Sequence, residues 1–165
     1  DDINEYVSQY GYDKFSFIHK NIRFLGFNSC LIKGDAGLPE RDQYEWIEEE
    51  LRAKKKVYYS LLFCHHPLFI TSVDEPGTYS NIAPDKRRRY LDLFKNNGVK
   101  AVFSGHYHNN SYGKYYGIEL ITTNAVGKPL GEALPGIRIV KVFKKRFESQ
   151  YVSLDEIPEV ITLKN

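Results

Sequence analysis

Methionine is absent from this 165-residue sequence, tryptophan occurs once and cysteine only twice. Cys30 and Cys64 stand alone, without the Cys-x-x-Cys spacing of redox or zinc motifs, which argues against a disulfide framework and a thiolate zinc site. We predict two buried free thiols, which lean towards a cytoplasmic setting. No apolar run approaches the roughly 18 to 20 residues that a membrane-spanning helix needs, so we expect a soluble chain without a membrane partner.

An excess of charge of one sign is missing as well. Lys and Arg number 23 against 21 acidic residues, which leaves a net charge of +2. Such a balance gives no general attraction to nucleic acid or anionic lipid, so any anion must be bound locally. The prediction is a protein without a nucleic-acid partner.

The beginning of the sequence also lacks a methionine, and residues Ile3 to Tyr10 already read as a helix. We therefore expect that an amino-terminal segment is missing. A targeting signal in such a segment would be invisible, so the localisation stays open beyond the indication from the thiols.

What the sequence does have is core material, with 42% apolar and 15% aromatic residues, enough for one domain. Strand-like and helix-like patterns alternate in the middle, and strand pairs stand at both ends. This predicts a layered mixed α/β fold in a single domain over 1–165. Strands are expected at 15–18, 22–27, 57–63, 99–103, 118–122, 137–143 and 147–152, and helices at 3–10, at 84–97 and from a capping box at Asp42 to Leu51.

Three of the five histidines follow predicted buried strands. His65 comes after the strand 57–63, and His106 and His108 come after 99–103. Ligands in open α/β sheets bind outside the carboxyl ends of the strands, so neighbouring strands would bring these imidazoles to one crevice. In an extended backbone His106 and His108 would project to the same side, each towards a different one of two adjacent ions. We predict that all three are metal ligands.

The ligands for a complete two-metal site are not all in this sequence. Imidazoles suit zinc, iron, manganese or nickel, but two cations roughly 3.5 to 4 Å apart also need a bridging carboxylate. There is no Asp-x-His, and the Gly-Asp pair at 34–35 lacks the second aspartate of a Gly-Asp-x-x-Asp box. We expect the missing carboxylates upstream.

The Phe-Cys-His-His-Pro segment at 63–67 and the Ser-Gly-His-Tyr-His segment at 104–108 resemble the later blocks of the calcineurin-like metallophosphoesterase superfamily. Other stretches resemble its calcineurin-like phosphoesterase domain-containing group, which is linked to Ser/Thr phosphatase activity: Phe15-Ser16-Phe17, Asn28-Ser29, Gln43 with Trp46, Gly136-Ile137-Arg138 and Tyr151 to Glu156. The likeness covers nearly the whole chain. It implies a layered mixed β-sheet sandwich with flanking helices, of which this chain is the carboxy-terminal half.

The resemblance also implies how the complete enzyme works. His65 and His106 would bind one metal and His108 the other, as two divalent or mixed-valence ions of Mn, Fe, Zn or Ni. A metal-bridging hydroxide would attack phosphorus in line while both cations neutralise the developing charge. The histidine that protonates the leaving group belongs to a Gly-Asn-His-Asp block that this sequence does not contain. The catalytic acid is therefore unknown here, and we expect this chain alone to be inactive.

Substrate contacts are assigned by position. His66 stands beside a ligand and either orients substrate or packs. Tyr79 and Asn81 lie in a loop of about a dozen residues after the His-Pro block, close to the expected crevice, and are candidates to line a substrate groove. The basic run at 86–89 is interpreted as a solvated helix face.

The leading functional prediction is a phosphomonoesterase acting on phosphoserine or phosphothreonine in proteins, or on small phosphoesters. A nucleotide or cyclic-nucleotide phosphodiesterase of the same superfamily stays open, as does a non-catalytic binding module that retains the fold. If another half supplies one of two packed sheets, this chain exposes an apolar face. We expect it to associate with itself or with the missing amino-terminal half.

Overall fold

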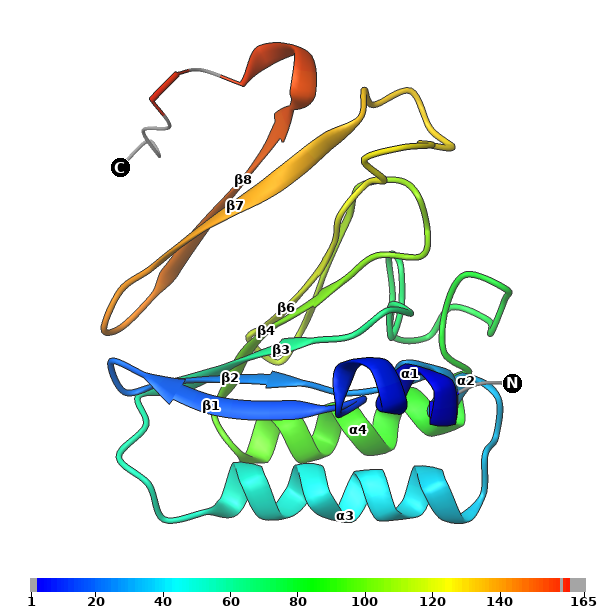
Figure 1. Cartoon of the computed structure of the whole chain (residues 1–165), viewed down its shortest axis with the longest axis vertical. Helices are drawn as coiled ribbons and strands as arrows, with labels where there is room; N and C mark the ends of the chain where they lie inside the picture. Colours follow the sequence, from blue (N-terminus) through cyan, green and yellow to red (C-terminus); the bar gives the residue numbers. More distant parts are fainter. Residues whose placement is uncertain (1–2, 158, 161–165) are drawn as a thin grey trace.

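The computed structural model describes residues 3–157 and 159–160, and it is built around a six-stranded sheet in the order β1-β2-β3-β4-β6-β5 (Figure 1). A separate two-stranded sheet pairs β7 with β8. The strands are β1 (Phe15–His19), β2 (Ile22–Gly26), β3 (Tyr59–Phe63), β4 (Val99–Ser104), β5 (Ser111–Tyr115), β6 (Ile118–Thr122), β7 (Gly136–Val142) and β8 (Phe147–Ser153). The helices are α1 (Ile3–Tyr10), α2 (Ser29–Lys33), α3 (Leu38–Arg52) and α4 (Pro84–Asn96), and a 3-10 turn covers Leu154–Glu156. The mixed α/β class predicted from the sequence is confirmed.

The four central strands of the large sheet, β2, β3, β4 and β6, run parallel to one another. The edge strands β1 and β5 are antiparallel to their neighbours. Parallel strands end at the same edge of a sheet, so the residues that follow β3 and β4 emerge side by side. This topology places both histidine segments at one edge.

Helices α3 and α4 cover one face of the large sheet (Figure 1). Their apolar residues recur at helical spacing and meet the strand residues that point to the same side. The shared core includes Leu25, Leu62 and Val102 from the strands, Ile47 and Leu51 from α3, and Leu91 and Phe94 from α4. This core fixes the strands whose ends carry the histidines.

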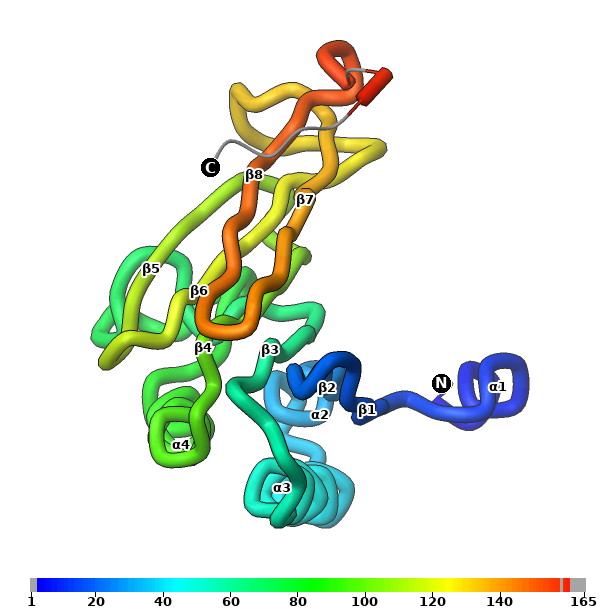
Figure 2. The backbone as a smooth tube through the Cα atoms, turned by 90° about the vertical axis from the view of Figure 1, so that its left-hand side faces the viewer, coloured from blue at the N-terminus to red at the C-terminus, as the bar shows by residue number. Residues whose placement is uncertain are grey.

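The hairpin β7–β8 lies over the other face (Figure 2). Val140, Val142 and Phe147 of the hairpin pack against a second buried cluster on the sheet. The Tyr59 hydroxyl donates to the carbonyls of Phe143 and Arg146, at 2.8 and 2.7 Å, which ties the hairpin turn to the start of β3. The sheet is therefore held between two layers, the second of them narrow.

A row of phenylalanine rings crosses the face under the hairpin and continues past it. The ring centroids lie 5.8 Å apart for Phe103 and Phe147, 5.4 Å for Phe63 and Phe103, 6.4 Å for Phe24 and Phe63, and 5.1 Å for Phe17 and Phe24. Phe17 at the β1 edge is 52% exposed. The face thus changes from covered to open along this row.

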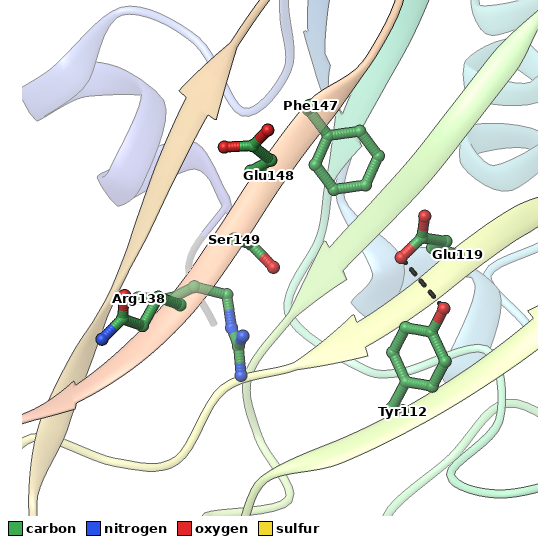
Figure 3. Close-up of a pocket in the computed structure, with 7 residues that line it drawn as sticks. Tyr112, Glu119, Arg138, Phe147, Glu148 and Ser149 are labelled. Carbon is green, nitrogen blue, oxygen red and sulfur yellow. Dashed lines mark hydrogen bonds between the residues drawn. The ribbon is translucent and has the colours of Figure 1, made fainter. Parts of the chain in front are cut away.

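A cleft of about 530 Å³, lined by both polar and apolar side chains, lies between β8 and the β5–β6 pair (Figure 3). Tyr112 and Glu119 line it from the sheet, and Arg138 and Ser149 line it from the hairpin. No histidine is among its lining residues in the described part of the chain. The cleft is separate from the histidine edge.

Several boundaries differ from the sequence predictions. Helix α3 begins at Leu38 and not at Asp42, because Gly37 turns the chain with φ of 63° and Pro39 is suited to a first helical turn. The strand expected at 57–63 begins at Tyr59. Helix α2 and strand β5 were not predicted. The prediction that Cys30 is buried is wrong, since it lies on α2 and is exposed.

Among the described residues, none of the helices combines the length and apolar character that crossing a bilayer requires. The basic run at 86–89 is not wholly a solvated face, because Arg87 is 0% exposed.

Candidate metal centre

The two histidine segments are joined through their backbones at the edge of the sheet. The amide of Cys64 donates to the carbonyl of Phe103 at 3.0 Å, and the amide of Gly105 donates to the carbonyl of His65 at 3.1 Å. These bonds continue the parallel pairing of β3 and β4 past the ends of the strands. His65 and His106 are therefore placed together by the sheet itself.

His65, His66 and His106 form a compact imidazole group. One ring nitrogen from each lies within 4.8 Å of the others. Nε2 of His65 and Nδ1 of His106 face one another at 3.0 Å. The ring centroids of His66 and His106 are 4.1 Å apart. Facing nitrogens at such distances are the arrangement that a shared cation would bridge.

The remaining nitrogen of His106 is held by the chain. Nε2 of His106 lies 3.2 Å from the Tyr79 carbonyl, which only accepts, so Nε2 carries the proton. The lone pair of Nδ1 is then directed towards His65. A backbone carbonyl that fixes a ligand's tautomer in this way is a usual outer partner of a metal-binding histidine.

His108 lies apart from this group and has its own carbonyl partner. Its Nδ1 is 2.8 Å from the carbonyl of Lys128, which leaves Nε2 free as an acceptor. The prediction that His106 and His108 project from an extended backbone is wrong. Both residues adopt left-handed conformations, with φ of 59° and 52°. The chain thus turns sharply at each of the two histidines.

A buried serine anchors the segment after β3. Ser29 is the first residue of α2, after the N-cap residue Asn28. Its hydroxyl oxygen accepts from the amides of His65 at 3.1 Å and His66 at 2.7 Å. It also lies 3.4 Å from Nδ1 of His66. Sequence reasoning missed this role, and the only available signal was a small polar residue following a strand.

The surroundings keep the two histidines of the first segment neutral. Burial lowers the pKa of His65, and the nearby His106 and His108 lower it further. Burial, followed by His106, His65 and Lys33, lowers the pKa of His66 to about 4. Neutral imidazole is the form that binds a cation. The donor set therefore fits a transition metal at neutral pH.

The two loop residues predicted as substrate contacts occupy different settings. Tyr79 is 81% exposed, and its ring centroid lies 4.9 Å from that of His106. Asn81 is 2% exposed, and its amide group donates to Glu75 and to the Pro76 carbonyl while accepting from Thr78. Of the two, only Tyr79 is exposed beside the histidine group.

The carboxylates needed for a second cation are not in this cluster. Among the described residues, no Asp or Glu joins the imidazole group. Asp13 lines a cavity of about 690 Å³ together with His65, Asn28 and Ser29, and its carboxylate accepts from the Asn28 side chain at 3.4 Å. The group thus offers imidazole nitrogens alone, and it contains His66, predicted as a substrate contact, where His108 was predicted as a ligand.

Imidazole nitrogens grouped beyond the carboxyl ends of parallel strands are compatible with a metal site in an α/β fold. The family model of the calcineurin-like phosphoesterases matches residues 2–110. The chain therefore belongs to the calcineurin-like phosphoesterase family, which uses a dinuclear metal site.

Curated relatives support this membership. The chain is 34% identical over 162 residues to serine/threonine-protein phosphatase CPPED1 of Homo sapiens, a match that covers 95% of this chain and 52% of the relative. It is 35% identical over 163 residues to the Danio rerio protein of the same name, with 96% and 53% covered. The chain spans about half the length of the curated relatives it matches.

Solved structures agree on the fold. Purple acid phosphatase PPD1 from yellow lupin seeds aligns with a TM-score of 0.58 and 16% identity, covering 92% of this chain and 36% of that one. GAP50, described as the anchor in the inner membrane complex of Plasmodium, aligns with a TM-score of 0.63 and 14% identity, covering 85% and 49%. At these identities the likeness concerns architecture alone.

Proposed function

We propose that this chain supplies the histidine ligands of a two-metal phosphoesterase site. The complete protein would be a phosphomonoesterase that acts on phosphoserine or phosphothreonine. The observation that carries the proposal is the facing pair of nitrogens, His65 Nε2 and His106 Nδ1, 3.0 Å apart. Family membership supports the hydrolase class, and the name of the curated relatives supports the phosphoprotein substrate.

The chain's own residues prepare this site for cation binding. His65 and His106 would hold one ion, and His108 would hold the other through its free Nε2. The Tyr79 and Lys128 carbonyls keep protons off the coordinating nitrogens of His106 and His108. Bound cations would supply Lewis-acid stabilisation of charge on the phosphoryl group and a lowered pKa of water. Carboxylate ligands and the leaving-group acid would come from the part of the relatives that this chain does not span.

Two other functions remain as alternatives. A nucleotide or cyclic-nucleotide phosphodiesterase would use the same ligands with a different substrate groove. A binding module would keep the fold without turnover. The hydrogen bonds that orient His106 and His108 support metal binding, and family membership favours catalysis over the binding module.

We also propose that the open part of the phenylalanine row is covered in the complete protein. Phe15, Phe17 and Ile18 on β1 are each more than a third exposed. Exposed apolar surface of this kind favours a packed partner, and the amino-terminal half or a second copy of the chain would fit. Light scattering of the purified chain, alone and with the upstream half added, separates these two partners.

Hydrolysis of p-nitrophenyl phosphate with added manganese tests the proposed function. The assay compares this chain with the full-length gene product, and a His65→Ala plus His108→Ala variant of each serves as control. We expect turnover by the full-length protein that the double substitution removes, and none by this chain above its control. Full-length protein whose activity is absent or insensitive to the substitutions would contradict the proposal.

A further inference from the structure

The loop at 70–83, which follows the first histidine segment, is organised around one carboxylate. Glu75 accepts from the amides of Ile70, Thr71 and Ser72, at 2.7, 2.9 and 3.1 Å, and from the Thr71 hydroxyl at 2.9 Å. Asn81 donates to the same carboxylate at 2.5 Å. A charged acceptor surrounded by backbone donors fixes the path of a loop far better than neutral contacts do.

Two basic side chains, Arg87 and Lys33, attach this loop to the neighbouring helices α4 and α2. The fully buried guanidinium of Arg87 on α4 donates to the Ile82 carbonyl at 2.7 Å and to the Glu75 carbonyl at 2.9 Å. Lys33 on α2 donates to the Asn81 carbonyl at 2.6 Å. Burying a guanidinium is unfavourable unless its donors are satisfied, and here loop carbonyls satisfy them. The loop is therefore braced from both sides.

The loop held in this way places Tyr79 beside His106, with the two ring centroids 4.9 Å apart. Tyr79 is 81% exposed, yet its carbonyl lies 3.2 Å from Nε2 of His106. A large apolar ring in water next to a metal-binding group contributes nothing to the core. Held in place, it offers contact area to a ligand at little cost in conformational entropy.

We propose that the 70–83 loop is a rigid recognition element of the phosphoesterase site, with Tyr79 as a specificity-determining residue and Glu75 as its positioning residue. Tyr79 packs against planar peptide groups or apolar side chains that flank the phosphorylated residue of a protein substrate. The inference rests on the proposed phosphoesterase function and deepens it, because it assigns the preference for peptides over small phosphoesters to one ring.

The test measures kcat and KM of the metal-loaded full-length gene product on two substrates, free phosphoserine and a phosphoserine peptide with apolar flanking residues. For Tyr79→Ala we expect KM for the peptide to rise roughly 3- to 10-fold, as loss of an aromatic contact predicts. KM for phosphoserine should stay within about twofold, and Tyr79→Phe should resemble the unmodified protein. The control is Tyr116→Ala, which removes another exposed tyrosine at the opposite end of the sheet.

An equal loss on both substrates, or no loss on the peptide, overturns the assignment of Tyr79. If neither substrate is hydrolysed, the proposed function fails. The same comparison is then made by calorimetry of peptide and inorganic phosphate binding. A weakening confined to the peptide supports the loop's role, and an equal or absent weakening overturns it.

Glu75→Gln tests the positioning role without touching the ring. We expect faster amide hydrogen exchange at 70–72 and a rise in KM for the peptide that exceeds the rise in KM for phosphoserine. Glu45→Gln, on the exposed side of α3, is the matched control. Unchanged exchange or an unchanged KM for the peptide overturns the role of Glu75.

Discussion

The two strand ends that carry the histidines are positioned in different ways. After β3, the backbone amides of His65 and His66 are fixed by the hydroxyl of the buried Ser29. After β4, His106 and His108 sit in strained left-handed conformations, and their rings are held by the carbonyls of distant loops. A buried side chain thus holds the backbone amides of the first segment, whereas loop carbonyls hold the histidine rings of the second. This difference makes the second segment the one that loop changes can tune.

Removing a ligand from either segment should have the largest effect. We expect His65→Ala and His106→Ala each to weaken zinc or manganese binding by more than the roughly 10- to 100-fold typical of outer-shell substitutions. Calorimetric titration of the full-length gene product measures this, with His19→Ala on β1 as control. Binding that survives both substitutions would contradict the ligand assignment.

Ser29→Ala probes the backbone-held segment. It leaves two amides at the site without their acceptor, so metal affinity should fall roughly 10- to 100-fold. The free energy of unfolding should also fall by about 1–3 kcal/mol, because the amides of His65 and His66 lose their partner. Metal titration and urea unfolding measure the two effects, with the exposed Ser8→Ala as control. Native affinity in Ser29→Ala would show that the sheet alone places the histidines.

A glycine at position 108 probes the strain in the second segment. His108 has φ of 52°, where glycine fits without the Cβ clash that alanine retains. We expect His108→Gly to be more stable than His108→Ala by about 1 kcal/mol in urea unfolding. Both variants should lose the second cation. Equal stability of the two would mean that the turn stores no strain.

Acid should weaken the loop that holds His106. Burial alone would raise the pKa of Glu75, but the amides of Ile70, Thr71 and Ser72 and the Asn81 side chain outweigh it and lower the pKa to about 2. The ionised carboxylate therefore stabilises the fold fully above about pH 4.5, and this contribution is lost as the pH falls towards 2. Urea midpoints between pH 6 and 3 should drop more steeply for the unmodified protein than for Glu75→Gln. Parallel curves would contradict this role.

The sequence predicted secondary structure best where apolar residues recur at the spacing of a strand or a helix. The strands at 99–103 and 118–122 and the terminal hairpins were predicted because apolar alternation there follows the sheet. The edge strand β5 escaped prediction because Ser111–Tyr115 is polar and contains Gly113, so tertiary pairing with β6 decides its structure. Helix α3 starts early because Gly37 and Pro39 outweigh the capping box at Asp42.

The site was predicted in part for a similar reason. Histidines at strand ends can be recognised from residue type and position, so His65 and His106 could be expected to meet. The partners that orient them could not, because the Tyr79 and Lys128 carbonyls belong to the backbone and carry no residue signature. The left-handed turns at His106 and His108 were missed because positive φ is uncommon for any residue other than glycine, although histidine adopts it more often than most.

Anomalous X-ray diffraction at the manganese or zinc edge, from crystals of the metal-loaded full-length gene product, tests the central claim most directly. We expect an anomalous peak between Nε2 of His65 and Nδ1 of His106, and a second peak beside Nε2 of His108. Absence of the first peak at saturating metal, or metal bound elsewhere on the protein, would contradict it.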